Sequence, residues 1–223
     1  AIAGNLPENI LEIINNCDLN YFKKISKKDK KDPTIYSSIR EGREVTFFEG
    51  IEFSRIFMSW LIPSTNEQNI ILGFEILSSI FSDGRNSILN RHLIEDEQLV
   101  ESVYSGIYPG EFGSLFIIES ICKRQNIEKV EIIINNLIKK ILNSEIIYPK
   151  IKQAIRIIKS NYIYNLETSS QVASYLGSNL LWGRLYPHLE LFKNFKYWDK
   201  AKNFKILFKF LLQNKFTLIV NSK

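Results

Sequence analysis

Residues 57–120 read FMSWLIPSTNEQNIILGFEILSSIFSDGRNSILNRHLIEDEQLVESVYSGIYPGEFGSLFIIES, and the order of patterns in this stretch decides the fold. A run of β-branched and aromatic residues ends at Pro63, which predicts a strand that stops there. Residues 64–84 then place apolar side chains at helical spacing between a Ser/Thr cap and a terminal glycine, Gly84. A strand followed by a helix is therefore expected.

The second part of the stretch predicts a short helix and a β-hairpin. Residues 85–97 have the pattern of the short helix. Residues 101–121 carry two strand-like runs on either side of Pro109–Gly110, which marks the turn. We expect this hairpin to lie in the same sheet as the first strand, with one core shared by Trp60, Phe74, Leu77 and Phe116.

The flanking sequence extends the same architecture. Residues 45–62 predict a strand pair or one long bent strand, with Gly50 at a turn or bulge, and residues 216–220 predict a closing strand. Helices are expected at about 126–144, 144–165, 168–181 and 197–213. The first has an apolar stripe made of Val130, Ile133, Ile134, Leu137, Ile138 and Ile141. The order β-(β)-α-α-β-β-α-α-α-α-β predicts an α+β domain whose mixed sheet carries helices on one face.

The start of the chain has a different pattern. Residues 1–4 read as the end of a strand and residues 5–16 as a helix. A lysine-rich run then breaks the pattern, and we expect a linker at about 26–36. The run has no aromatic residue between its lysines, which favours a solvated linker over a nucleic-acid groove. These lysines are Lys23, Lys24, Lys27, Lys28, Lys30 and Lys31.

The bulk composition fits one large globular domain. The chain has 223 residues and 26.0 kDa, with 45% hydrophobic and 24% charged residues and a formal net charge of +5. Cys17 and Cys122 are far apart in the sequence, which favours a reducing compartment such as the cytoplasm. No signal peptide and no apolar run of bilayer length is visible, but the sequence reads as if it begins within a domain, so the missing leader says little.

Residues 92–96, HLIED, are one residue short of the HxxEH signature of inverted zinc proteases. That helical motif needs two histidines one turn apart to hold zinc, and a glutamate between them as general base. Asp96 replaces the second histidine, and the only other histidine, His188, is far away in the sequence. The residues therefore indicate a coincidence without a metal site. We expect the solvent side of a short helix at His92, Glu95, Asp96 and Glu97.

The same region resembles the second, non-catalytic half of the pitrilysin/insulinase family of zinc metallopeptidases. The shared pattern is a strand ending in WxxP, an apolar helix, and then GRxSxLxxxLxExxxLV before a hairpin. In this sequence the pattern stands at Trp60 to Pro63, Gly84, Arg85, Ser87, Leu89, Leu93, Glu95, Leu99 and Val100. The likeness covers about residues 45–223. The opening AIAGNLPENILEII resembles the strand and helix that close the catalytic half of these proteins.

The resemblance implies a metallopeptidase-like α/β roll that holds no metal. It divides the chain into residues 1–25, the end of a preceding catalytic-type half, residues 26–36, the linker, and residues 37–223, the non-catalytic roll. In such proteins the catalytic half carries HxxEH with its zinc, and the two halves close around a peptide chamber. The resemblance thus implies no cofactor in this chain, zinc in the other half, and two partners: a homologous catalytic half, in the same or a separate chain, and a peptide.

The resemblance also assigns two positions at the substrate chamber. Active members have an arginine there, followed seven residues later by a tyrosine, and both contact the substrate at the zinc site. This sequence has Ile94 and Glu101 instead. The helix that corresponds to the HxxEH helix is about residues 66–81, which contain no histidine. We therefore expect no catalytic and no metal-binding residue, so the isolated chain should be inert even if its parent is a zinc-dependent metalloendopeptidase.

Three functions remain open at the level of sequence. The chain can be the wall and scaffold of an active peptidase, or an inactive pseudo-peptidase subunit that pairs with an active chain. An HxxEH motif upstream would decide between these two. A basic binding module unrelated to proteolysis is the third possibility, and salt-sensitive DNA binding through the lysine run would support it. An independent enzyme finds little support, because glycine-rich phosphate loops and GxSxG elbows are missing.

Overall fold

The computed structural model describes residues 1–17, 40–142, 147–181, 187–213 and 215–222. The chain forms two compact units. Unit 1 contains Ala1–Thr34 and Asn161–Pro187, and unit 2 contains Ile35–Ser160 and His188–Lys223. The expected linker and its lysine run lie outside the described residues. The boundaries 1–25, 26–36 and 37–223 remain predictions.

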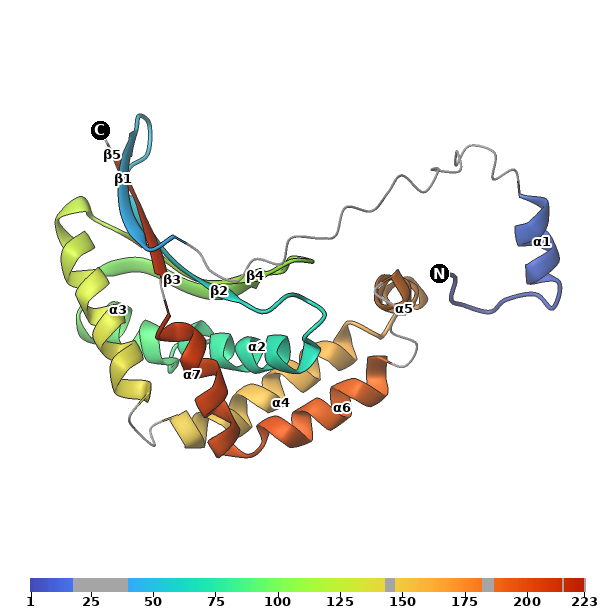
Figure 1. Cartoon of the computed structure of the whole chain (residues 1–223). Helices are drawn as coiled ribbons and strands as arrows, with labels where there is room; N and C mark the ends of the chain where they lie inside the picture. Colours follow the sequence, from blue (N-terminus) through green and yellow to red (C-terminus); the bar gives the residue numbers. More distant parts are fainter. Residues whose placement is uncertain (18–39, 143–146, 182–186, 214, 223) are drawn as a thin grey trace. The chain divides into compact units, whose positions relative to one another are not determined.

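Unit 2 is built on one mixed sheet of five strands, as the sequence predicts (Figure 1). The strands are β1 (Gly42–Phe48), β2 (Ser54–Ile62), β3 (Val100–Tyr108), β4 (Ser114–Cys122) and β5 (Lys215–Ser222). Their order is β1-β5-β2-β4-β3, in which β1 runs parallel to β5 and the other neighbours are antiparallel. The expected hairpin is therefore β3 and β4.

Residues 45–62 contribute two separate strands instead of one long bent strand, but the expected pairing between them is wrong. They turn at Gly50, whose φ of +83° lies in the region that glycine tolerates best. The two strands do not pair with each other, because β5 lies between them. Strand β5 thus completes the sheet by inserting between β1 and β2.

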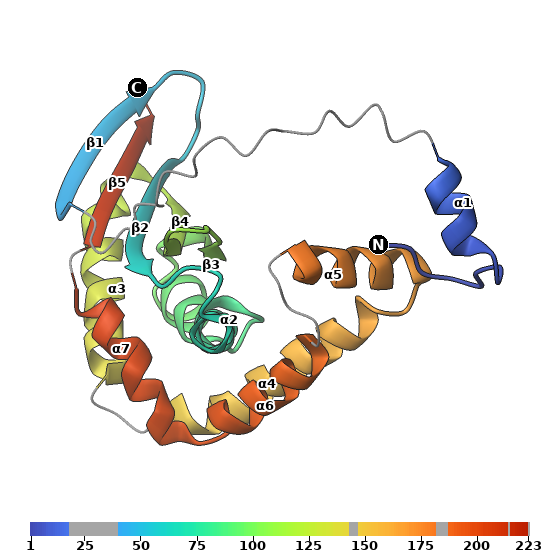
Figure 2. The same ribbon diagram turned by 45° about the vertical axis from the view of Figure 1, so that its right-hand side comes forward.

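One face of the sheet is covered by α2 (Gln68–Ser82), α3 (Ile127–Leu142) and α7 (Lys205–Leu211), which lie on the same side in both views (Figures 1 and 2). The alternating burial of β2 and β4 places every second side chain in this layer. Phe116 is central: its ring centroid lies 6.2 Å from that of Trp60 and 5.3 Å from that of Phe74. Leu77 is fully buried as well. The expected core is confirmed.

The corner after α2 begins at Gly84, which has a φ of +76°, and continues into η2 (Asn90–Asp96), a π-helix. The short helix expected at 85–97 therefore exists, but its hydrogen bonding is wider than that of an α-helix. Asn90 helps to hold the corner, because its Nδ2 donates to Ser82 O and Gly84 O, both at 2.9 Å.

The expected helix at 197–213 is wrong in its extent. The chain instead forms α6 (Pro187–Trp198), the 3-10 turn η5 (Ala201–Phe204) and α7. The break is packed, because the rings of Trp198 and Phe204 meet edge to face at 5.0 Å and both are buried. Trp198 Nε1 also donates to Asn69 O at 2.7 Å, which ties the end of α6 to α2.

Four further helices are described. The 3-10 turn η3 (Arg124–Asn126) and most of α4 (Tyr148–Tyr164) belong to unit 2. The last four residues of α4, from Asn161, belong to unit 1, as do α1 (Ile10–Asn16) and α5 (Ser169–Leu181). Thr168 caps α5, because its Oγ1 accepts from Gln171 N at 3.2 Å. Residues 1–4, expected as the end of a strand, have no strand structure, because no neighbouring strand of the described chain pairs with them.

Two general features complete the description. Cys17 and Cys122 are both free thiols. Within the described ranges, no helix is both long enough and apolar enough to cross a membrane.

Candidate functional site

The two positions that the resemblance assigns to the substrate chamber lie on either side of the corner between η2 and β3. Ile94 is in the π-helix and is half-buried, whereas Glu101 is the second residue of β3 and is exposed. The corner is closed by a backbone hydrogen bond from Leu99 N to Leu93 O at 2.9 Å.

Both positions lie where the backbone departs from regular structure. Ile94 belongs to the seven-residue π-helix. In the β3–β4 ladder, Val100 is opposite Cys122 and Ser102 is opposite Ile121, so Glu101 is an extra residue in a β-bulge. Gln98, two residues before this strand, also contributes, because it has a positive φ of 51°. Bulges and π-helices redirect side chains and are frequent at functional sites. At these two irregular positions the chain has a neutral side chain, Ile94, and an acidic one, Glu101.

Three carboxylates of the HLIED region lie on the surface of this corner, and two of them are in ion pairs. Arg85 donates to Glu95 through Nε and Nη2, both at 2.8 Å, and this hydrogen bonding lowers the pKa of the Glu95 carboxyl. Lys129 of α3 donates to Glu97 at 2.7 Å and lowers the pKa of that carboxyl in the same way. These groups brace the corner, and their lowered pKa is the opposite of what a general acid needs near neutral pH.

His92 is tied to its own helix. Its Nδ1 lies 3.0 Å from Ile88 O, and because a carbonyl oxygen can only accept, this contact places a proton on Nδ1. Within the described part of the chain, no three His, Cys, Asp or Glu residues are grouped so that they could hold a metal ion. Nothing is described of the side chain of His188. The residues around HLIED therefore do not fit a zinc site.

Helix α2 contains the region expected to correspond to the HxxEH helix, and its inner side carries serines. Ser78 Oγ donates to Ser105 O at 2.6 Å, and Ser105 N donates to Ser82 Oγ at 2.9 Å. These bonds join α2 to the edge strand β3, with Ser105 itself buried. This contact was not predicted, although two serines four residues apart on one helix face could have indicated it.

The second face of the sheet was not predicted as a candidate site, although helices expected on one face leave the other uncovered. Its side chains alternate with the buried ones, and they are partly accessible along the three central strands, β5, β2 and β4. We call this surface the open face. Its apolar members on these strands include Phe57, Leu61, Leu115, Ile117, Phe216 and Leu218.

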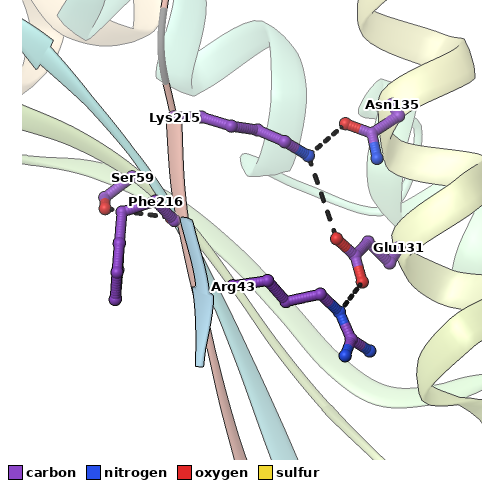
Figure 3. Close-up of polar contacts among 6 residues, drawn as sticks. All are labelled: Arg43, Ser59, Glu131, Asn135, Lys215 and Phe216. Atoms are coloured by element: carbon purple, nitrogen blue, oxygen red, sulfur yellow. Dashed lines mark hydrogen bonds and ion pairs between the residues drawn. The ribbon is translucent and has the colours of Figure 1, made fainter. Parts of the chain in front are cut away.

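Neighbouring strands place these side chains side by side. Phe57 is opposite Leu218, and Leu61 is opposite Leu115. Ser59 lies between them and donates to Phe216 O at 3.2 Å, which satisfies its hydroxyl on an apolar surface (Figure 3). On the edge strand, Tyr108 is 58% exposed. A sheet face this rich in accessible apolar groups is typical of a surface that meets another protein.

Comparison with known proteins assigns the family. Residues 1–154 match the family model described as the peptidase M16 inactive domain. The chain belongs to this family. No curated protein sequence matches this M16 inactive domain.

The fold of the M16 inactive domain is shared with several solved structures. A protease from Helicobacter pylori is similar with a TM-score of 0.72 and 18% identity, over 98% of this chain and 54% of that protein. A peptidase M16 inactive domain from Pseudomonas fluorescens has a TM-score of 0.68 and 13% identity, over 84% and 47%. Complex III from Candida albicans contains a chain with a TM-score of 0.64 and 13% identity, over 81% and 46%. This chain therefore spans about half the length of these structures.

Proposed function

We propose that this chain forms one wall of a peptide-binding chamber by packing against a zinc-bearing M16 half. The open face carries the proposal, because it is an apolar surface on a sheet whose other face is already filled by helices. The proposal extends to the parent protein, in which the zinc-bearing half is part of the same chain or of a separate one.

The chemistry of the described residues supports a scaffold more than a catalyst. Peptide hydrolysis by a metallopeptidase needs a metal that activates water and polarises the carbonyl. The HLIED region offers one histidine and three carboxylates, of which Glu95 and Glu97 are in ion pairs. Ile94 and Glu101 add neither a cation nor a phenol at the chamber positions. Loss of one such transition-state contact typically costs a few kcal/mol, or about two to three decades in rate.

A pseudo-peptidase subunit is the closely related alternative. The similarity to a chain of complex III from Candida albicans supports a role within an assembly. The two alternatives differ in where the zinc-bearing half is found. An HxxEH motif upstream would place it in the same protein, whereas a pseudo-peptidase subunit pairs with a separate, active chain. A cytoplasmic location, consistent with two free thiols, is part of the proposal.

The test uses a quenched fluorescent peptide as substrate. The chain is assayed alone, then together with an M16 half that carries HxxEH, and then with the substitutions Ile94→Arg and Glu101→Tyr added. We expect no cleavage by the isolated chain, chelator-sensitive cleavage by the joined halves, and faster cleavage after the double substitution. His92→Ala is the matched control and should leave the rate unchanged.

Chelator-sensitive cleavage by the isolated chain would refute the scaffold role. Ile117→Lys places a charge on the open face, and unchanged association of this variant with a zinc-bearing half would refute the chamber-wall role, even if the isolated chain is inert.

A further inference from the structure

Helices α4 and α6 form an outer layer of unit 2, which lies beyond α2 on the side away from the sheet (Figures 1 and 2). Residues 148–160 of α4 and residues 188–198 of α6 belong to this unit. Two hydrogen bonds tie the layer to the rest of the unit: Trp198 Nε1 donates to Asn69 O at 2.7 Å, and Lys150 Nζ donates to Asn86 O at 2.7 Å. The layer is on the helix-covered side of the sheet. Its outer surface is therefore separate from the open face, and an inference about it goes beyond the proposed function.

The excess of positive charge is concentrated in these helices. Residues 148–164 and 187–212 contain ten lysines and arginines but only two acidic residues, Glu190 and Asp199, whereas the whole chain is nearly balanced, with 29 basic and 24 acidic residues. Six exposed cations of the layer, which we call the basic face, take part in none of the ion pairs found in the described part of the chain. They are Lys152, Arg156, Lys159, Lys193, Lys196 and Lys200.

The cations of α4 share one side of that helix. Lys152, Arg156 and Lys159 follow one another at intervals of four and three residues, which are single helical turns. This side adjoins α6, because Lys159 Nζ lies 5.0 Å from the centroid of the Phe195 ring. The positive charges of the two helices therefore lie on adjoining surfaces.

Helix α6 exposes large aromatic side chains beside its lysines. Phe192 is 63% exposed and Tyr197 is 39% exposed. Phe192 lies one turn before Lys196, and Tyr197 lies one turn after Lys193, so each ring is next to a charge. The outer surface of the layer thus combines unpaired positive charge with apolar groups that gain from leaving water.

This combination fits an anionic bilayer surface better than a nucleic acid. At a bilayer, lysines are attracted to acidic headgroups while neighbouring apolar side chains enter the boundary with the acyl chains. Single-stranded nucleic acids are bound in grooves, and recognition of their phosphates favours the planar fork of arginine. Here the charges lie on the outer side of packed helices, and five of the six cations of the basic face are lysines.

We propose that the basic face binds the surface of an anionic phospholipid bilayer. The lysines meet the acidic headgroups, and Phe192 and Tyr197 enter the headgroup region. The helices lie along the surface and do not cross it. The open face, on the other side of the sheet, stays available for a zinc-bearing half.

The experiment is cosedimentation of the full chain with sucrose-loaded phospholipid vesicles. One set of vesicles contains phosphatidylcholine with about 30% phosphatidylserine, and the other contains phosphatidylcholine alone. We expect binding to the acidic vesicles at least about tenfold tighter than to the neutral ones. About 0.5 M salt should remove most of this difference, because the attraction is screened.

A pair of charge reversals tests the basic face. Lys193→Glu/Lys196→Glu should weaken binding to the acidic vesicles at least about tenfold. Lys123→Glu/Arg124→Glu is the matched control, because both cations are exposed, lie before α3 and change the net charge equally. The control should change binding less than about threefold.

A pair of phenylalanine substitutions tests the apolar contribution. Phe192→Ser should weaken binding to the acidic vesicles at least about threefold, because less apolar surface is buried in the bilayer. Phe48→Ser is the matched control at a similarly exposed ring, 57% against 63%, and should leave binding unchanged. Both variants should keep the melting temperature of the wild type, which shows that they fold.

Several results would overturn the proposal. Equal binding to acidic and neutral vesicles, or no binding to either, would exclude an anionic bilayer as the partner. Equal losses in the two charge-reversed variants would show nonspecific attraction, and equal binding of Phe192→Ser and Phe48→Ser would show that no side chain enters the bilayer. Binding of an oligonucleotide more tightly than the acidic vesicles at the same salt, lost in Lys193→Glu/Lys196→Glu, would assign the basic face to nucleic acid.

Discussion

Arg85 and Glu95 form a two-point ion pair, with Nε to Oε1 and Nη2 to Oε2 both at 2.8 Å. The pair connects the turn after α2 with the π-helix η2. Two of the residues in the GRxSxLxxxLxE pattern thus contact each other directly, while Leu89 and Leu93 of the same pattern are buried. The pattern therefore describes how this corner folds.

Replacing Arg85 by Gln should lower the melting temperature by an amount that depends on pH. Arg85 lowers the folded-state pKa of Glu95, so the ion pair contributes stability above the unfolded pKa of that carboxyl. This contribution is lost as the pH falls through the folded-state pKa. Thermal melts at pH 7 should separate Arg85→Gln from the wild type slightly, and melts at pH 2.5 or in 1 M salt should not. Arg91→Gln, at an exposed arginine of the same corner, should show no such pH dependence.

Gly73→Ala should destabilise the chain by about 1–3 kcal/mol through overpacking. A Cβ at this position of α2 would lie 2.7 Å from Trp198 Cε2, closer than carbon atoms can approach. The higher helix propensity of alanine, about 1 kcal/mol, does not offset the clash. Urea denaturation measures the effect. In a double-mutant cycle, Trp198→Phe should reduce the cost of Gly73→Ala, and strict additivity would contradict a direct contact.

The sequence predicted the elements whose signals are local. The hairpin followed from its turn, and α3 followed from an apolar stripe, of which Val130 and Ile134 are fully buried. Pairing between distant segments has no such signal. The insertion of β5 between β1 and β2 is set by long-range pairing, and the break after Trp198 depends on an indole bond to Asn69.

The candidate site was predicted less completely than the fold. The sequence places Ile94 and Glu101 at this corner, but the π-helix and the bulge at Glu101 depend on how the corner packs. The open face was missed for a different reason. Helices were expected on one face of the sheet, but consecutive apolar residues such as Ile117 and Ile118 are typical of a strand buried on both faces, so the sequence did not indicate that the uncovered face is an accessible apolar surface.

Cys122 should be unreactive in the folded protein. It is fully buried, and burial raises the pKa of its thiol to about 11, so the thiolate is scarce below that pH. With Ellman's reagent at pH 8, we expect about one reactive thiol in the native chain and about two after denaturation. The fast thiol should be the exposed Cys17 and should disappear in Cys17→Ser. Rapid native labelling of the Cys17→Ser variant would contradict this assignment.

Zinc should not bind stoichiometrically at His92. Its Nδ1 contacts Ile88 O, and the nearby Glu95 and Glu97 are held in ion pairs. Elemental analysis of untagged protein after exposure to zinc and dialysis should give less than one equivalent. His92→Ala should leave the metal content unchanged. One equivalent of zinc that is lost in His92→Ala would show that the corner rearranges to bind metal.

Ile117 and Ile118 are neighbours on β4 that point to opposite faces of the sheet, and they provide a matched test of the open face. Ile118 is fully buried under the helices, so Ile118→Ala should cost about 2–5 kcal/mol by leaving a cavity. Ile117→Ala should cost roughly 1 kcal/mol, because the half-exposed site leaves no closed cavity.

Ile117→Lys should still fold but should weaken association with a zinc-bearing M16 half at least about tenfold, since a charge would have to be buried in the interface. Unfolding curves and a titration followed by light scattering measure the two effects. Equal stability costs at the two positions would show that the face is covered within this chain, and unchanged association of Ile117→Lys would place the partner elsewhere.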